Sequence, residues 1–224
     1  YSARSWKLCY CCTQNIKHRF NVSNISPIDG RYKKNVSELE TFFSEQALMR
    51  HRVMVEVEYL LALIEHRSFQ KTRALSKKTL NSLKGLYVEF SADHFKQIKK
   101  IEKKTNHDVN AVVVFVSEKL KKLGRGDLVP FVHFGLTSED INNISYSLMT
   151  QGAVEDVMIP SVKRVLKELK ALSKKTKSLS LLSLTHGQPA TTTTLGKELA
   201  VFVSRVEREI ALIKKMKLLA KLSG

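Results

Sequence analysis

One histidine in this 224-residue sequence stands in a setting that suits proton transfer. His186 follows Thr185 and precedes Gly187 and Gln188, so hydroxyl and amide groups flank its imidazole. An imidazole titrates near neutral pH and can serve as an acid or a base where a loop brings it to a cleft. Taken alone, His186 fits a structural role at least as well.

Two polar clusters stand where helices are expected to begin. They are Thr105-Asn106-His107-Asp108 and Thr137-Ser138-Glu139-Asp140. In each cluster Thr precedes Asp by three residues, which is the spacing of a capping box. The unpaired N–H groups of a helix amino terminus also attract carboxylates and phosphates. Each cluster therefore predicts a helix start that could hold an anion, although ordinary capping explains either one alone.

A third polar stretch, Ser-Pro-Ile-Asp-Gly-Arg-Tyr at residues 26–32, predicts a turn-rich loop because Pro and Gly interrupt regular structure. Such a loop would expose Arg31 and Tyr32, which could grip an anion. The sequence contains no Walker loop, dinucleotide-binding glycine pattern, His-Glu-x-x-His motif or nucleophile elbow. Triphosphate hydrolysis, nicotinamide chemistry and zinc proteolysis are therefore disfavoured.

The chain is strongly basic, since 38 Lys and Arg against 21 Asp and Glu give a formal charge of +17. This excess favours anionic ligands. The aromatic content of 8% and the lack of a zinc-finger or RNA-recognition motif argue against a nucleic-acid partner. Solvated helix faces rich in Lys are the simpler explanation. No apolar run approaches the roughly 18 residues of a membrane-spanning helix, so no membrane partner is expected.

Residues 1–22 form a basic leader, and no acidic residue occurs before Asp29. We expect this leader to be disordered, although its composition also resembles an organellar transit peptide. The expected location is the cytoplasm, with an organelle as the alternative. Cys9, Cys11 and Cys12 lie within the leader, where they cannot cross-link the fold. Because no set of four ligands is available there, we expect no metal site.

Apolar residues recur every three or four positions, and Pro is limited to 4 residues, which predicts an all-α protein. Helices are expected at residues 44–66, 91–105 and 105–124, and from Pro160 onward. The Thr-rich segment 181–196 is expected to be a loop. Residues 197–222 contain neither Gly nor Pro and predict a helix of about 39 Å. Such a rod needs partner helices.

Four stretches taken together resemble the adenylosuccinate lyase family of the fumarase/aspartase superfamily. They are the stretch at 26–32, Thr-Asn-His-Asp-Val at 105–109, Thr-Ser-Glu-Asp-Ile-Asn-Asn at 137–143, and Thr-His-Gly-Gln-Pro-Ala-Thr at 185–191 with Gly-Lys-Glu at 196–198. They occur in the family's order, and the resemblance covers residues 23–224. It implies a helical first domain at 23–130 and, at 131–224, the opening of a long-helix central bundle that four chains build together.

The resemblance implies that fumarate is eliminated from adenylosuccinate, or from the succinyl-carboxamide ribonucleotide of purine synthesis, without a metal or organic cofactor. A base removes a proton beside a succinyl carboxylate, and an acid protonates the departing nitrogen. By position, His186 corresponds to the family's general acid, and Gln188 shapes its loop. The positions that correspond to substrate contacts are Arg31 and Tyr32 for the nucleotide, the stretch Asn106, His107 and Asp108, and Thr137 and Ser138 for the succinyl oxygens.

The sequence also departs from the family pattern. Leu184, Thr192 and Tyr146 stand where the family commonly has Arg, Pro and His. The Ser-rich loop followed by Met-Pro-x-Lys, which supplies the family's base, does not occur before Gly224, so we expect an amino-terminal part of a lyase that is inactive alone. An argininosuccinate-type lyase and an inactive truncated product acting as an oligomerisation partner remain alternatives. A basic nucleic-acid binder explains only the charge.

Overall fold

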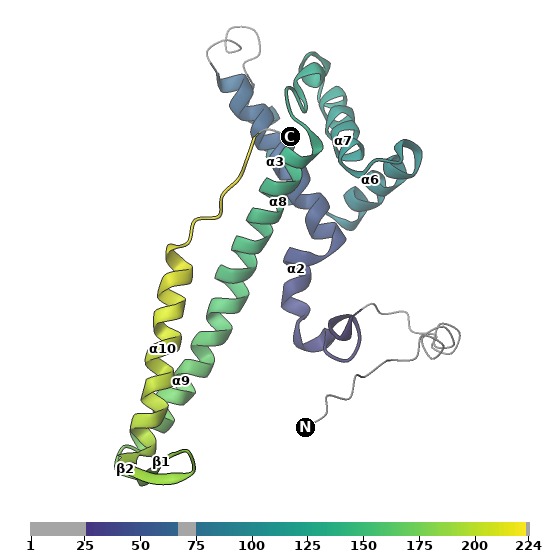
Figure 1. The fold of residues 1–224 in the computed structure, drawn as a ribbon. Helices are drawn as coiled ribbons and strands as arrows, with labels where there is room; N and C mark the ends of the chain where they lie inside the picture. The colour runs from purple at the N-terminus through teal and green to yellow at the C-terminus, as the bar shows by residue number, and fades with distance from the viewer. Residues whose placement is uncertain (1–25, 67–74, 223–224) are drawn as a thin grey trace, which may run out of the picture. The chain divides into compact units, whose positions relative to one another are not determined.

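The computed structural model describes residues 26–66 and 75–222. These residues are mainly helical, with one antiparallel pair of strands, and the all-α expectation is confirmed (Figure 1). The chain divides into two units, Tyr1–Glu38 and Leu39–Gly224. The expected leader at 1–22, with the 3 cysteines, lies outside the described residues. The expected domain boundary near residue 130 stays a prediction.

The elements follow one another in a simple order. The 3-10 turns are η2 (Pro27–Asp29), η3 (Lys33–Asn35), η4 (Ser37–Leu39) and η5 (Gly126–Phe131). The helices are α2 (Glu40–Phe43), α3 (Glu45–Glu65), α5 (Lys77–Val88), α6 (Ala92–Thr105), α7 (Asp108–Lys122), α8 (Ser138–Ala153), the π-helix η6 (Val154–Met158), α9 (Ile159–Lys175) and α10 (Leu195–Lys215). The strands are β1 (Ser180–Thr185) and β2 (Gln188–Thr194).

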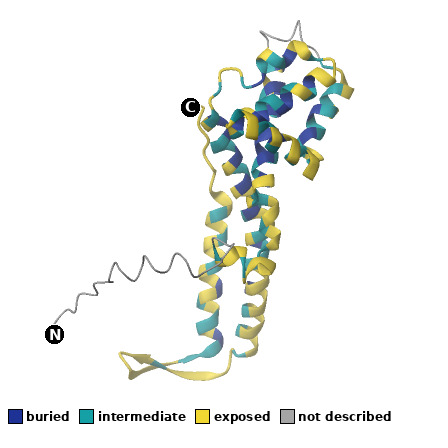
Figure 2. Ribbon diagram, turned by 90° about the vertical axis from the view of Figure 1, so that its right-hand side faces the viewer, coloured by how far each residue is buried: buried dark blue, intermediate teal, exposed yellow. Residues whose placement is uncertain are grey.

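Helices α3, α5, α6, α7 and α8, here called the head, contain most of the buried residues (Figure 2). α3 is the central helix, and its contacts reach α5, α6, α7 and α8. The largest fully buried apolar side chains are Phe115, Met49, Leu60, Leu83, Ile98 and Leu120. Removing such side chains from water contributes about 1.5–3 kcal/mol each, which explains why the head can hold polar groups in fixed positions.

The helix starts in the head follow the expected capping chemistry with one correction. Ser44 and Ser91 accept hydrogen bonds from Ala47 and His94 and begin α3 and α6, as predicted. The predicted capping box at 105–108 is wrong, because α6 continues to Thr105 and is capped by Asn106, whose backbone is left-handed (φ 51°). His107 then serves as the cap of α7, and its Nδ1 accepts the N–H of Asn110.

Helices α8, η6 and α9 form one continuous rod. Pro160 is the second residue of α9 and directly follows the π-helix, where the α-helical hydrogen-bond pattern is already interrupted. α10 packs along α9 in the opposite direction (Figure 1). Gly196 makes this approach feasible, since a Cβ there would lie 2.4 Å from the carbonyl oxygen of Ser173. Together α9, β1, β2 and α10 are here called the arm.

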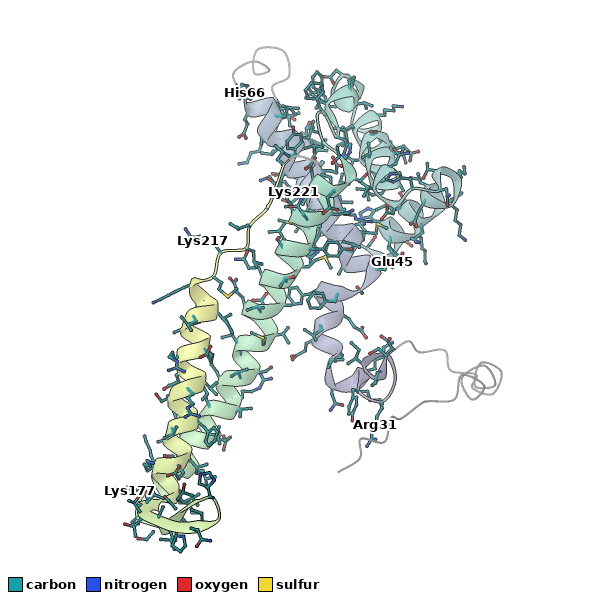
Figure 3. The ribbon with its side chains drawn as sticks, in the orientation of Figure 1. Arg31, Glu45, His66, Lys177, Lys217 and Lys221 are labelled. Atoms are coloured by element: carbon teal, nitrogen blue, oxygen red, sulfur yellow. The ribbon has the colours of Figure 1, made fainter. Side chains whose placement is uncertain are left out.

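Two expectations about the arm are wrong. Residues 181–196 are not a loop, because β1 and β2 pair as a hairpin whose two-residue turn is His186-Gly187 (φ 51° and 77°). The last helix ends at Lys215 rather than near Leu222. Residues 216–222 run back along α8, where the Asn143 side chain exchanges hydrogen bonds of 3.0 and 3.1 Å with the backbone of Lys221 (Figure 3).

Candidate functional site

The amino termini of α7 and α8 converge in the head. Val55, Val109 and Ile141 form a small buried cluster that joins α3 to the first turn of each of these helices. On the polar side of this cluster, Nε2 of His107 lies 3.5 Å from Oγ of Ser138. Two of the motifs singled out in the sequence are therefore brought together, although 31 residues separate His107 from Ser138 in the chain.

The hydrogen bonds around His107 define how its ring is used. Nδ1 accepts the backbone N–H of Asn110 at 3.2 Å, so a neutral imidazole carries its proton on Nε2. Nε2 faces Ser138, which is the first residue of α8. The first N–H groups of α7 are already bonded to His107 and Asp108, so the groups that can together hold a carboxylate or a phosphate are the imidazole N–H, the Ser138 hydroxyl and the open N–H groups at the start of α8.

The capping box predicted for α8 is confirmed. The buried carboxylate of Asp140, which is 2% exposed, accepts hydrogen bonds from the N–H and the hydroxyl of Thr137 at 2.8 and 3.0 Å. The hydroxyl proton of Thr137 is thereby directed at Asp140, and only its oxygen lone pairs can meet a ligand. The donors toward an anion at this helix start are therefore Ser138 and the backbone.

Asp108 faces a partner that sequence reasoning missed. Its Oδ2 lies 2.7 Å from Nη2 of Arg52 in α3, and its Oδ1 accepts the N–H of Val109 at 2.8 Å. Burial alone would raise the pKa of Asp108, but the Val109 amide and the Arg52 guanidinium outweigh it and lower that pKa. Asp108 is therefore a carboxylate. An arginine amid the apolar residues of a predicted helix was the available signal for Arg52.

Asn106 completes this end of the head. It is exposed and lies with His107 and Asp108 at a groove of about 590 Å³ that Lys99, Glu102 and Lys103 also line. Nζ of Lys99 forms ion pairs with the carboxylates of Glu45 and Glu102, at 2.7 and 2.8 Å. The groove thus combines exposed amide and imidazole groups with two lysines and two carboxylates, so its lining carries charges of both signs.

His186 and Gln188 lie elsewhere in the chain. The continuous helical rod from Ser138 to Lys175 is about 57 Å long at 1.5 Å per residue, and the hairpin follows its far end. Figure 3 labels Lys177, which marks that end of the arm. His186 and Gln188 are both exposed there, so a single copy of the chain does not bring His186 to His107 and Ser138.

Arg31 and Tyr32 belong to the first unit. Ser26 caps η2, and its backbone N–H in turn donates to Asp29 at 3.0 Å, which orders the expected turn-rich loop. The guanidinium carbon of Arg31 lies 5.6 Å from the ring centre of Tyr32, and both side chains are exposed. The pair can offer a cation and an aromatic face to one ligand.

Two further features can be assessed among the described residues, a metal-holding cluster and a membrane-spanning helix. Among residues 26–66 and 75–222, no group of three or more His, Cys, Asp and Glu side chains could hold a metal ion. Within the same ranges, no helix combines the length and the apolar character that crossing a bilayer requires.

Comparison with known proteins decides the family. A family model described as lyase matches residues 30–224. The chain belongs to this lyase family. It is 44% identical to adenylosuccinate lyase of Dictyostelium discoideum over 85% of this chain and 42% of that protein. It is 38% identical to adenylosuccinate lyase of Escherichia coli K12 over 91% of this chain and 45% of that protein.

These comparisons confirm the family resemblance carried by the four motifs. The chain spans less than half the length of the curated relatives it matches. Among solved structures, a fumarate lyase from Mesorhizobium sp. BNC1 matches with a TM-score of 0.64 and 19% identity over 84% of this chain and 42% of that one. A β-carboxy-cis,cis-muconate cycloisomerase from Acinetobacter calcoaceticus matches with a TM-score of 0.60 and 20% identity over 84% and 43%. At these identities the likeness shows the fold alone.

Proposed function

We propose that this chain is part of an adenylosuccinate lyase, which eliminates fumarate from adenylosuccinate and from the succinyl-carboxamide ribonucleotide of purine synthesis. The observation that carries the proposal is the 44% identity to a curated adenylosuccinate lyase over 85% of the chain. The geometry supports it, because two helix starts meet at His107 and Ser138, where a succinyl carboxylate can be held.

In this proposal each predicted residue has one role. Ser138 donates to the succinyl oxygens, and Thr137, whose N–H and hydroxyl are bonded to Asp140, fixes the helix start beside them. Asn106, His107 and Asp108 lie next to this position. Arg31 and Tyr32 hold the nucleotide. His186 protonates the departing nitrogen as general acid, and Gln188 orients its turn. The base is not among the predicted residues of this chain.

The active site is shared between copies of the chain in a homotetramer. His186 lies at the far end of a rod about 57 Å long from Ser138, so the acid and the carboxylate site of one reaction come from different subunits. The exposed apolar side chains of the arm, among them Phe202 and Leu212, supply the surface for this assembly. The ligands are the purine nucleotide and fumarate, no cofactor is required, and the proposed location is the cytoplasm.

The test is turnover by this chain extended to the full length of its relatives. Purified protein should convert adenylosuccinate with release of fumarate, followed by absorbance and by an independent fumarate assay. The 224-residue chain alone should give no measurable turnover. Conversion of argininosuccinate but not adenylosuccinate would contradict the proposal and favour the argininosuccinate-type alternative. Assembly without activity toward either substrate would favour the inactive oligomerisation partner.

A further inference from the structure

Arg52 is a charged residue inside the head. It lies in the middle of α3 and is only 3% exposed. A guanidinium stays charged at any physiological pH, and a buried charge needs partners that replace its lost hydration. The identity of those partners shows which parts of the fold Arg52 joins.

The guanidinium of Arg52 joins three helices. Nη2 lies 2.7 Å from Oδ2 of Asp108 in α7, and Nε donates to Oδ1 of Asn142 in α8 at 2.9 Å. Nη1 approaches the sulfur of Met49 on α3 itself at 3.8 Å. Each contact uses a different N–H direction of the planar group, which the single ammonium of a lysine cannot reproduce.

These contacts lie next to the candidate carboxylate site. Asp108 follows His107 directly in the chain, and Asn142 lies one helical turn after Ser138 on the same face of α8. Arg52 therefore contacts the residue next to His107 and a residue one helical turn from Ser138. Nε2 of His107 and Oγ of Ser138 themselves lie 3.5 Å apart. A change in the Arg52 contacts would alter the separation of His107 and Ser138.

α3 holds the segment before α8 in the same way. Glu56 accepts a 2.6 Å hydrogen bond with Nδ1 of His133, and the Tyr59 hydroxyl donates to the carbonyl of Phe134 at 2.9 Å. Arg52, Glu56 and Tyr59 are spaced by four and three residues, so they form one stripe along α3. The approach to α8 and its first turns are therefore both anchored to this helix.

We propose that Arg52 is a positioning residue, which holds the starts of α7 and α8 in one arrangement so that the carboxylate site at His107 and Ser138 is formed before substrate binds. The inference rests on the proposed function for the identity of the ligand, a succinyl group. The expected effect of Arg52 on the geometry of His107 is independent of the proposed function.

The variants are Arg52→Met and Arg52→Lys, with Arg50→Met as the matched control. Arg50 lies on the same helix and is half-buried, but its Nε donates to the carbonyl of Tyr87 in α5 at 3.1 Å rather than to α7 or α8. Loss of the Arg52 guanidinium leaves Asp108, whose side chain is 45% exposed, open to water. We therefore expect Arg52→Met to fold, which thermal unfolding checks.

The first readout needs no activity. In the 224-residue chain, NMR of the His107 imidazole, assigned with His107→Asn, reports the surroundings of its ring. Arg52→Met should shift or broaden the His107 resonances, Arg52→Lys should do so less, and Arg50→Met should leave them unchanged. Resonances of Arg52→Met identical to those of the parent would overturn the proposal, whatever the enzyme does.

The second readout uses the chain extended to the length of its relatives with adenylosuccinate as the probe. Arg52→Met should raise KM about tenfold and lower kcat/KM about 100-fold, since small misplacement of binding groups has costs of this order. Arg52→Lys should recover part of the loss, and Arg50→Met should match the parent. Misfolding lowers only the active fraction, so a reduced kcat with an unchanged KM would overturn the positioning role.

The two readouts separate the two hypotheses. An inactive extended parent would contradict the proposed function and leave the NMR comparison to decide the role of Arg52. If Arg52→Met does not fold, Arg52→Lys supplies both comparisons. Parent-like resonances and a parent-like KM in Arg52→Lys would then overturn the proposal.

Discussion

The head and the arm differ in how far they bury their apolar side chains. In the head, α3 buries apolar residues such as Leu60. Its buried Arg52 has partners in α7 and α8, and its buried Glu56 has a partner, His133, in the turn before α8. In the arm, α9 and α10 pack on each other but leave large apolar side chains such as Phe202 and Leu212 exposed, and His186 projects at an exposed turn (Figure 2). The head buries its apolar side chains within one chain, whereas the arm leaves apolar side chains and His186 exposed, and in the proposed function these serve other copies of the chain.

In the proposed function, this contrast explains how one chain can contribute to an active site without forming one. The proposed binding groups lie at helix starts that pack against buried residues of the head. The arm carries the proposed acid about 57 Å along a helical rod from the nearest of those groups. Changes in the two regions should therefore have different consequences, and the following predictions use that difference.

The largest effect is expected for His186→Asn in the chain extended to the length of its relatives. Asparagine keeps a polar side chain of similar size and tolerates the positive φ of 51° at this turn. Loss of a general acid typically costs about 10²–10⁴-fold, so kcat for adenylosuccinate should fall by about 100-fold or more while substrate still binds. The matched control, His66→Asn at the exposed end of α3, should retain parental kcat. Near-normal kcat in His186→Asn would contradict the proposal that His186 is the general acid.

A second prediction compares one leucine from each region in the 224-residue chain. Leu60→Ala removes a side chain that is 0% exposed and should lower the free energy of unfolding by about 2–5 kcal/mol. Leu212, at 52% exposed, should change that free energy by less than about 0.5 kcal/mol when replaced by Ala at concentrations where the chain is monomeric.

Leu212→Ala should instead weaken self-association, which sedimentation at micromolar concentration measures, since an exposed apolar face favours association. Denaturant unfolding provides the stability comparison for both leucines. Equal losses of unfolding free energy in the two variants, or a parent chain that stays monomeric at micromolar concentration, would contradict the division into a self-contained head and a partner-dependent arm.

A smaller effect is expected from pH at the His133–Glu56 pair. The hydrogen bond to Glu56 raises the pKa of His133, burial opposes that rise, and the charges of Glu56 and Asp140 add to it. The folded pKa is thus above the unfolded value of 6.5, so the stabilisation is fully present below about pH 6.5 and is lost as pH rises through the folded pKa.

His133→Asn should remove this dependence while tolerating the local φ of 60°. Unfolding free energies measured from pH 5 to pH 9 should decline more steeply in the parent than in His133→Asn. Parallel curves would mean that the Glu56 contact does not stabilise protonated His133.

Much of the head could be predicted from local sequence. Ser44 and Ser91 begin helices because a short hydroxyl side chain satisfies free N–H groups, and the apolar spacing behind them defines the buried face. The cap at Thr137 was predictable for the same reason. The error at Thr105 arose because Thr, Asn and His can all end or begin a helix, and only the left-handed backbone of Asn106 decides between them.

What could not be predicted depends on contacts between distant residues. The hairpin at 180–194 was missed because both strands are largely exposed: β1 contains three leucines without regular alternation, and β2 is rich in Thr, so neither shows the pattern of a half-buried strand. The pairing of Arg52 with Asp108 and Asn142 joins positions far apart in the chain, and no local pattern encodes it. The motifs at 105–108 and 137–140 contain the proposed binding residues, but they did not predict how far these residues lie from His186.

The central claim is that the acid and the carboxylate site come from different copies of the chain, and subunit mixing tests it most directly. Two inactive variants of the extended chain are prepared, His186→Asn in the arm and Ser138→Asp, which places a negative charge at the proposed carboxylate site in the head. The two variants are mixed in equal amounts, unfolded and refolded together. Random assembly should then restore about one quarter of parental turnover, because about one quarter of the sites combine an intact arm with an intact head. A mixture no more active than the separately refolded variants would contradict the shared site.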